Sequence, residues 1–427
     1  MGGYSLSFIL EFVWSVISTS DFWAMTIRMT TPVLFAALGS CIASKAGIFN
    51  MSIEGLINST AFISVLADGV VRKLAMGGKK KADFVDLVGS TYATKEDAEL
   101  AYEALKASAG TWGWIAGILG GMLFGIVMEL VFAYFVIDLK ANPSLTGIGA
   151  NMLIVGLMPF LSLVITGNRA NTNTWYDLGY VPVVNIPVIK DIPVISVLLS
   201  GHYILTYICV ACIFIVNVMM FRTALGLRIR AVGENPNAAE SVGVDVRRIQ
   251  YIANVLCGFF GSMGGTFMSL CYVGFWVRGI AAGRGFIGLA ASTLGQGMPI
   301  ATTIYAYVFG WFDALGINMR ALSLFPSQFL SMLPYLATLI GLILYSMGTQ
   351  RKCAKARLLA NRITFYKGPC TLCTGFLYCG EGEMSVRCAR RWCGKAAGEE
   401  KGIEPRWPDA PNYIKNESLP SAESIRR

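Results

Sequence analysis

Histidine and charge are both scarce in this sequence, and each shortage excludes a class of protein. Among 427 residues there is one histidine, His202, and no serine lies in a nucleophile-elbow sequence, which excludes Ser/His catalysis and two-histidine metal chemistry. Charged residues make up 14% of the chain, whereas soluble globular proteins carry roughly 25%. Hydrophobic residues make up 55%, in runs that approach or exceed the ~20 residues a helix needs to cross a bilayer. The sequence therefore predicts an all-α polytopic membrane protein.

Nucleotide-binding signatures are missing as well. The Gly-Lys dipeptide at 78–79 lacks the upstream glycine and the following Ser or Thr of a phosphate-binding loop, so we expect this chain to bind no ATP and no other cofactor itself. Residues 283–288 (GRGFIG) match G-x-G-x-x-G, but no strand precedes them and no acidic partner follows at the needed distance, which argues against a dinucleotide site. No basic region precedes the first apolar residues, so no cleaved signal is expected.

The basic charge is concentrated in the C-terminal tail. The formal net charge is +9, and residues 351–427 hold fifteen Lys and Arg against eight Asp and Glu. A basic segment after the last span is typical of a cytoplasmic C-terminus, and without a recognition motif it predicts no nucleic-acid partner. Six of the eleven cysteines lie in this tail, where we expect reduced thiols. They could ligate zinc, but the spacing is irregular and no histidine is near, so we predict no metal site; the candidates are Cys370, Cys373, Cys379, Cys388 and Cys393.

The apolar runs predict about eight to ten transmembrane or re-entrant helices. Residues 1–71 hold an interfacial helix (4–20), with a true span as the alternative, and the first spans. Residues 72–112 form an extramembrane insert, 113–350 form the transmembrane core, and 351–427 form the cysteine-containing tail. The predicted spans are residues 25–43, 53–71, 114–137, 145–165, 194–220, 251–272 and 324–347. Two short, glycine-rich segments, 285–294 and 300–311, either cross or are re-entrant helices buried in protein. The other five cysteines are expected to pack in the spans as small hydrophobic residues: Cys41, Cys209, Cys212, Cys257 and Cys271.

Two details refine this outline. The insert contains a soluble-looking helix at 94–108, and we place it outside the cell although three lysines at 79–81 conflict with that side. The loop at 166–194 is expected to be extracytoplasmic, with short strands at 181–188. A four-residue repeat of glycine within one span predicts close approach of another helix; its members are Gly117, Gly121 and Gly125.

A basic loop interrupts the apolar runs at residues 222–250. It carries five arginines against three acids, and a surplus of arginine in a short loop predicts a cytoplasmic position. Asn235 is a candidate N-cap, Pro236 suits the first helical position, and Gly243 would end the helix. A short helix set across this loop would offer a surface to another protein, and the alternative is an ordinary connecting loop.

Four stretches together resemble one protein family. They are 226–245 (GLRIRAVGENPNAA, then GVD), 38–55 (LGSCIASKAGIFNMSIEG), 145–161 (LTGIGANMLIVGLMPFL) and 282–291 (AGRGFIGLAA). As a set they resemble the permeases of bacterial ABC importers, in the branch for simple sugars, nucleosides and branched-chain amino acids. The match is closest to the second permease of nucleoside uptake systems. The resemblance covers about 25–348 without the insert, and the long tail departs from it.

The resemblance implies a transport subunit and not an enzyme. It would form half of the path for a small neutral solute, first of all a nucleoside, with a sugar or a branched-chain amino acid as alternatives. The implied partners are a homologous second permease, an ABC ATPase with two nucleotide sites that holds ATP and Mg, an extracytoplasmic substrate-binding lipoprotein, and the lipid bilayer. The implied location is the bacterial plasma (inner) membrane, with coupling loop and C-terminus cytoplasmic. The residues implied in coupling to the ATPase are Arg230, Gly233, Glu234, Asn235, Pro236, Ala238, Ala239 and Gly243.

Candidate residues of the solute path lie elsewhere in the chain. The resemblance implies that Asn50 and Glu54 sit at a helix start, where the helix dipole favours a carboxylate. Glu54 would then anchor helix packing in the translocation unit or line the path, and the alternative is a plain N-terminal helix acid. The Asn151 amide lies in an apolar span, so it either faces the path or bonds to a neighbouring helix. Three aromatic residues could stack on a base or a sugar, although Trp276 could equally belong to an interfacial belt; they are Phe275, Trp276 and Phe286.

Other transport and enzyme classes are less consistent with the sequence. An ion-coupled secondary transporter normally has ionisable groups at mid-membrane, and the candidates here are Glu129 and Asp313. Glu129 lies towards the predicted cytoplasmic end of its span, where we expect partial solvation. An intramembrane enzyme would need a constellation of His, Asp or Ser that the spans lack.

Overall fold

The computed structural model describes residues 14–75, 95–173, 181–184, 200–320, 332–343 and 347. The predicted tail with its cysteines, the lysines of the insert and most of the predicted interfacial helix lie outside these residues. Within them the chain is almost entirely helical, and seven helices are long and apolar enough to cross a membrane. This confirms the prediction of an all-α polytopic membrane protein.

The described elements follow the predicted order, with small shifts at their ends. The long helices are α2 (Ser20–Lys45), α3 (Ile53–Ala75), α5 (Lys95–Ala133) with the π-helix η1 (Tyr134–Asp138), α6 (Pro143–Thr166), α8 (Ile204–Arg222), α11 (Val246–Thr266) with the π-helix η3 (Phe267–Val273), and α13 (Pro299–Arg320). The shorter elements are α9 (Ala224–Glu234), α10 (Pro236–Ser241), α12 (Arg284–Leu294), a helix at Leu333–Ile343, and the antiparallel strands β1 (Val183–Val184) and β2 (His202–Tyr203). The strand β1 falls inside the segment predicted to hold short strands.

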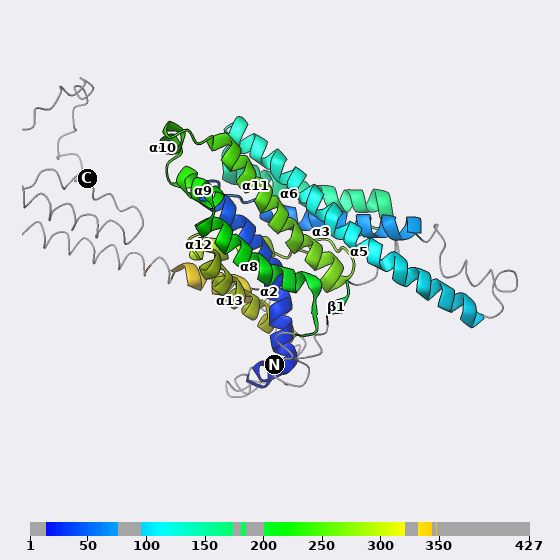
Figure 1. Ribbon diagram of the computed structural model, residues 1–427. Helices are drawn as coiled ribbons and strands as arrows, with labels where there is room; N and C mark the ends of the chain where they lie inside the picture. The colour runs from blue at the N-terminus through cyan, green and yellow to red at the C-terminus, as the bar shows by residue number, and fades with distance from the viewer. Residues whose placement is uncertain are drawn as a thin grey trace, which may run out of the picture. The chain divides into compact units, whose positions relative to one another are not determined.

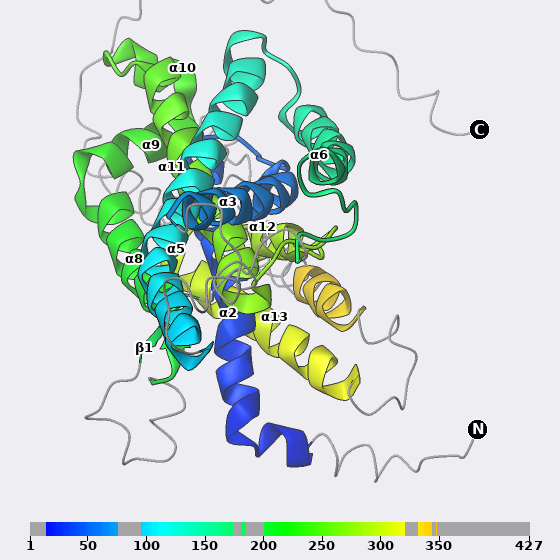
Figure 2. The same cartoon turned by 90° about the vertical axis from the view of Figure 1, so that its right-hand side faces the viewer.

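Helix α2 runs through the middle of the described helices (Figures 1 and 2). It packs against α8, α9, α11, α12 and α13, and nearly every side chain from Met29 to Ala43 is buried. Since a helix that is apolar all round must be covered on every side, its neighbours form a ring around it. The five cysteines predicted to act as small hydrophobic residues are buried, unpaired thiols in this ring and its neighbours.

Glycines bring α5 into backbone contact with α3 and α11. A Cβ added at Gly117 would lie 2.8 Å from the carbonyl oxygen of Ser64, and a Cβ at Gly125 would lie 2.5 Å from the Cβ of Ser262. No larger residue fits there without moving a helix. The four-residue glycine repeat therefore predicted the packing correctly.

The described ends of the predicted insert are continuous with the neighbouring helices. Helix α3 continues to Ala75, and α5 begins at Lys95 and runs without a break into its spanning part. Arg72 and Asp68 are both buried and form an ion pair of 2.7 Å, and the Arg72 guanidinium also donates to the carbonyl oxygen of Gly110, 3.3 Å away. Residues 72–75 and 109–112 therefore belong to the helical bundle, because this paired charge can be buried where an unpaired one could not.

Helix α12 begins inside the bundle, part-way along α2. Its first residue, Arg284, contacts the sulfur of Met29, and its Ser292 hydroxyl lies 2.7 Å from that of Ser40, so α12 runs parallel to the second part of α2. After a turn at 295–298, α13 runs back along α2 as a full-length span. Of the two short segments, 285–294 is thus a half-length helix starting within the bundle, and 300–311 is part of a complete crossing.

Candidate functional site

The basic loop folds into two short helices at the end of the bundle opposite β1 (Figure 1). Helix α10 begins at Pro236, the side chain of Asn235 accepts a hydrogen bond of 3.2 Å from the N–H of Ala238, and Gly243 follows the helix with φ +83°. This confirms the predicted N-cap, first residue and terminator. The helix α9 before it was not predicted, because its few apolar residues are interspersed with arginines.

Helix α10 protrudes and α9 anchors it. Of the residues predicted to couple to a partner, Glu234, Asn235, Pro236, Ala238 and Gly243 are exposed, Arg230 and Gly233 are half-buried, and Ala239 is buried. The exposed surface continues past the helix to Val242, which is 78% exposed. These residues thus form one surface, and nothing else within the described residues covers it.

The buried face of α9 ties this surface to the membrane helices. Ile229 and Val232 are fully buried in the core cluster that contains α2, α8 and α11. At the end of α9, a Cβ added at Gly233 would lie 2.0 Å from the carbonyl oxygen of Lys45, the last residue of α2. Backbone touches backbone here, so a displacement of α9 has no compressible side chain to absorb it.

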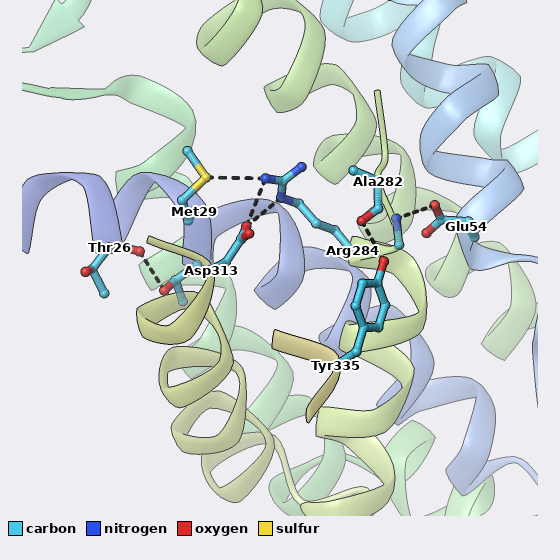
Figure 3. Close-up of polar contacts among 9 residues, drawn as sticks. Thr26, Met29, Glu54, Ala282, Arg284, Asp313 and Tyr335 are labelled. Carbon is cyan, nitrogen blue, oxygen red and sulfur yellow. Dashed lines mark hydrogen bonds and ion pairs between the residues drawn. The ribbon is translucent and has the colours of Figure 1, made fainter. Parts of the chain in front are cut away.

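A second candidate site lies where α3 and α12 begin. The Glu54 carboxylate accepts hydrogen bonds from the N–H groups of Gly283 (2.7 Å) and Gly285 (2.9 Å), the residues around the first turn of α12. Figure 3 shows Glu54 beside this part of the chain, which Ala282 and Arg284 mark. The first N–H groups of a helix have no partner within the helix and carry its positive partial charge. A half-buried carboxylate from another helix therefore fixes the start of α12.

The same junction holds a buried ion pair. Two guanidinium nitrogens of Arg284 lie 2.9 and 3.0 Å from one oxygen of Asp313 in α13, and both side chains are buried (Figure 3). On the other side of the α12 start, the Tyr335 hydroxyl donates to the carbonyl oxygen of Ala282, 2.9 Å away. Arg284 and Tyr335 were not predicted as site residues. The signal that could have found the pair is one arginine and one aspartate in neighbouring apolar segments, since buried charges in membranes pair.

Asn50 and Glu129 form a buried polar cluster with Ser52. The Asn50 amide donates to one carboxylate oxygen of Glu129 (2.8 Å), and the Ser52 hydroxyl lies 3.0 Å from the other. Glu129 is 1% exposed. The expectation of partial solvation was wrong, because the segment before α3 covers the carboxylate and supplies its hydrogen bonds in place of water.

Asn151 fastens α6 to the start of α3. Its side-chain oxygen accepts from the N–H of Gly55 (2.7 Å), and its side-chain nitrogen donates to the carbonyl oxygen of Met51 (2.8 Å). Both ends of the amide are thus used between helices, as in the interhelical alternative. The structure brings Asn50, Glu54 and Asn151 together around a single stretch of chain, residues 50–55.

The three aromatic candidates lie in different surroundings. Trp276 is 1% exposed and packs edge-on against Phe62 at 5.1 Å, so in this structure its ring belongs to the core and not to an interfacial belt or a stacking surface. Phe275 is half-buried. Phe286 is 40% exposed on the first turn of α12, next to the Glu54 junction, and keeps a face available for a solute or a partner helix.

The carboxylates of these sites are engaged in contacts within the protein. Among the described residues no group of three or more His, Cys, Asp or Glu is placed to hold a metal ion. The buried carboxylates are used as hydrogen-bond acceptors or ion-pair partners. The site therefore consists of an exposed, rigidly anchored surface at one end and a fastened helix junction inside the bundle.

Sequence comparisons find relatives over the same region. The family described as "Branched-chain amino acid transport system / permease component" matches residues 23–351. The guanosine ABC transporter permease protein NupQ of Bacillus subtilis (strain 168) is 30% identical over 321 residues, which are 74% of this chain and 89% of NupQ. The nucleoside ABC transporter permease protein NupC of Lactococcus lactis subsp. cremoris (strain MG1363) is 27% identical over 324 residues, 74% of this chain and 89% of NupC. The putative glucose ABC transporter permease protein TsgC13 of Haloferax volcanii is 27% identical over 299 residues, 70% of this chain and 78% of TsgC13. No solved structure matches the chain.

Proposed function

Since this chain belongs to the family of branched-chain amino acid transport system permease components, we propose that it forms half of the translocation path of an ATP-binding-cassette importer for nucleosides. The single observation that supports this mechanism is the exposed surface of α10, held on the membrane helices by the backbone contact between Gly233 and Lys45. An external ATPase that moves this surface moves the end of α2 with it. Alternating access then follows from a push applied at one end of the bundle.

The orientation in the membrane follows from charge. The segment that carries α9 and α10 has five arginines, and the tail after the last described helix is also basic. Both lie on the cytoplasmic side under the positive-inside rule. The location is the plasma membrane of a bacterium, with the opposite end of the bundle, which carries β1 and β2, facing outward.

The transporter needs subunits that this chain does not supply. One permease provides one wall of a path, so a homologous second permease faces it. ATP and Mg are held by a separate ABC ATPase with two nucleotide sites, and a substrate-binding lipoprotein delivers the solute from outside. This chain then carries out transport and no bond chemistry of its own.

A neutral solute suits the chemistry of the bundle. Among the described residues, Arg284–Asp313 and Arg72–Asp68 form buried ion pairs. The buried Glu129 and the half-buried Glu54 are hydrogen-bonded. An ionic solute would meet no free counter-charge from these two ion pairs. Two of the relatives are named for guanosine or nucleoside transport, which favours a nucleoside. Glucose is the second candidate, because a similar relative is named as a putative glucose permease.

Reconstitution tests the proposal. The chain is co-expressed with its partner subunits, and ATP-dependent uptake of labelled guanosine, glucose and leucine is measured in vesicles. We expect guanosine uptake to require ATP and to disappear when the phosphate-binding lysine of the ATPase partner is replaced. Uptake that runs at the same rate without ATP would contradict the importer assignment. Uptake of glucose without guanosine would keep the importer and replace the solute.

A further inference from the structure

One short stretch of chain touches both candidate sites. The connecting segment, defined here as Lys45–Gly55, includes the last residue of α2, the turn at 46–52 and the first residues of α3. Its first residue carries the carbonyl oxygen against which Gly233 of α9 packs. Its second-last residue, Glu54, holds the first turn of α12. Eleven consecutive residues thus run from the exposed end of the molecule to the junction inside it.

The contact with α9 is made by main-chain atoms on both sides. A Cβ at Gly233 would lie 2.0 Å from the Lys45 carbonyl oxygen and 3.2 Å from the Gly47 nitrogen. Gly47 has φ +82°, a left-handed conformation that glycine adopts without strain and that turns the chain back into the bundle. The start of the connecting segment therefore follows any displacement of α9.

The middle of the connecting segment is not helical, yet it is fastened on two sides. Asn50 and Ser52 hold the Glu129 carboxylate of α5, and Asn151 of α6 bonds both Met51 and Gly55. Asn50 also makes a hydrogen bond within the segment: its side-chain oxygen accepts from the N–H of Ser52 at 2.8 Å. Residues 46–52 lack the continuous backbone hydrogen bonds of a helix, and these side-chain bonds take their place. The segment is therefore held to its neighbours and does not behave as a flexible loop.

The C-terminal end of the connecting segment is bonded to backbone N–H groups at a helix start and not to a side chain. One oxygen of Glu54 accepts from the N–H of Gly283, the residue before α12, and the other from the N–H of Gly285 in its first turn. A Cβ at Gly285 would lie 2.6 Å from the Cα of Glu54. Charge-assisted bonds of this kind are stronger than neutral ones, and here the helix dipole adds to them. Phe286, the next residue of α12, is the candidate path residue that keeps an exposed face.

We propose that the connecting segment transmits the movement of α9 to the first turn of α12, with Glu54 as the positioning residue that completes the link. This rests on the proposed function, since it says how a push on α10 reaches the solute path. Glu54 touches no solute in this scheme. It makes α12, and with it Phe286, move with the end of α2.

The test separates ATP hydrolysis from transport. The full complex, with ATPase and second permease, is reconstituted in vesicles, and guanosine uptake and ATP hydrolysis are measured together. In Glu54→Gln the carboxylate charge is lost, and we expect the guanosine taken up per ATP hydrolysed to fall about tenfold. The hydrolysis rate should change less than about twofold, because the ATPase still binds α10.

A matched control uses another bond that holds α12. Ser292→Ala removes the 2.7 Å hydrogen bond to Ser40, which ties α12 to α2 without involving the connecting segment. We expect Ser292→Ala to leave uptake per ATP within about twofold of the wild type, since a single neutral hydrogen bond contributes little net free energy. Asn151→Ala, which releases the segment from α6, is the second variant if Glu54→Gln accumulates poorly, and it should lower the same ratio.

The outcomes distinguish the two proposals. A wild-type complex that takes up guanosine with ATP, together with Glu54 and Asn151 variants of unchanged uptake per ATP, overturns the connecting-segment proposal and leaves the importer in place. The proposal would also be overturned if Glu54→Gln and Asn151→Ala lowered ATP hydrolysis and uptake to the same extent. It would equally be overturned if Ser292→Ala lowered the guanosine uptake per ATP as much as they do. In either case the residues would act only in folding. A wild-type complex without any ATP-dependent uptake contradicts the proposed function itself.

Discussion

Helices α10 and α12 start in opposite surroundings, and each start is secured in the way its surroundings demand. Asn235 caps α10 from the position immediately before it, in the open. Glu54 caps α12 across a sequence separation of 229 residues, inside the bundle. Water can replace a lost cap at the surface, whereas a buried helix start must find a strong acceptor in the protein. A helix that begins inside a membrane protein is thus tied to its neighbour, and one that begins outside is free to meet a partner.

The largest effect is expected from the ion pair at the α12 start. Arg284→Met leaves Asp313 buried without its partner, which should lower the free energy of unfolding by about 3–5 kcal/mol. The exposed pair Arg248–Asp245 at the start of α11 is the matched control. Arg248→Met should cost less than about 1 kcal/mol. Thermal unfolding in detergent measures both, and equal losses would show that burial does not distinguish the two regions.

The next effect should come from the buried cap. Glu54→Ala leaves the N–H groups of Gly283 and Gly285 without acceptors, and we expect a loss of about 2–3 kcal/mol. Glu54→Gln should lose less, because an amide oxygen still accepts one of the bonds. The same unfolding assay applies, and a Glu54→Ala protein as stable as the wild type would mean that water reaches the start of α12.

The contact between the two regions gives the third effect. Gly233→Ala places a methyl group against the carbonyl oxygen of Lys45, so α9 must shift, at a cost of about 1–3 kcal/mol. Uptake should fall more than ATP hydrolysis. Gly149→Ala in α6 is the control, since a Cβ there meets nothing within 4 Å and alanine favours the helix. If Gly149→Ala impairs uptake as much as Gly233→Ala, the contact has no special role.

The exposed cap should matter less for stability. Asn235→Ala removes the bond to the N–H of Ala238, which typically costs ~1 kcal/mol of local helix stability. Asn235→Asp keeps an acceptor and should behave like the wild type. Binding of the ATPase subunit by pull-down or light scattering measures the consequence, and we expect Asn235→Ala to bind more weakly while global unfolding stays unchanged.

The smallest effect on stability should come from Val242. Its side chain is 78% exposed, so Val242→Ser should change the free energy of unfolding by less than about 0.5 kcal/mol. If this surface docks on the ATPase, the same change should still weaken the complex. A variant that binds the ATPase with full affinity would show that Val242 is not part of the docking surface.

The contrast between the two caps also explains what the sequence could and could not predict. The limits of α10 were predicted from Asn235, Pro236 and Gly243, because capping and termination depend on residues a few positions apart. The close packing of α5 followed from the spacing of its glycines for the same reason. The bonds of Glu54 to Gly283 and Gly285 depend on which helices meet, and no local pattern contains that information.

The differences between the sequence-based predictions and the structure have the same origin. Glu129 was placed at a solvated end, but its partner Asn50 is 79 positions away and buries it. Trp276 was considered for a path or an interfacial belt, and it is instead packed against Phe62 from a distant helix. The insert was predicted to extend to residue 112 because its composition is polar, and helix α5 runs through that point. Composition predicts the average environment of a segment. The environment of each single residue also depends on partners that are distant in the sequence.

The backbone contact between Gly233 and the Lys45 carbonyl limits which amino-acid substitutions this protein can accept during evolution. Every amino acid carries the same carbonyl group, so position 45 can accept almost any replacement without altering this touching point, whereas glycine has no substitute of equal size at position 233. A library of random variants selected for nucleoside-dependent growth should therefore show wide variation on one side of the contact and near invariance on the other. Such unequal tolerance to substitution at two touching positions is the genetic signature of a contact made by main-chain atoms alone.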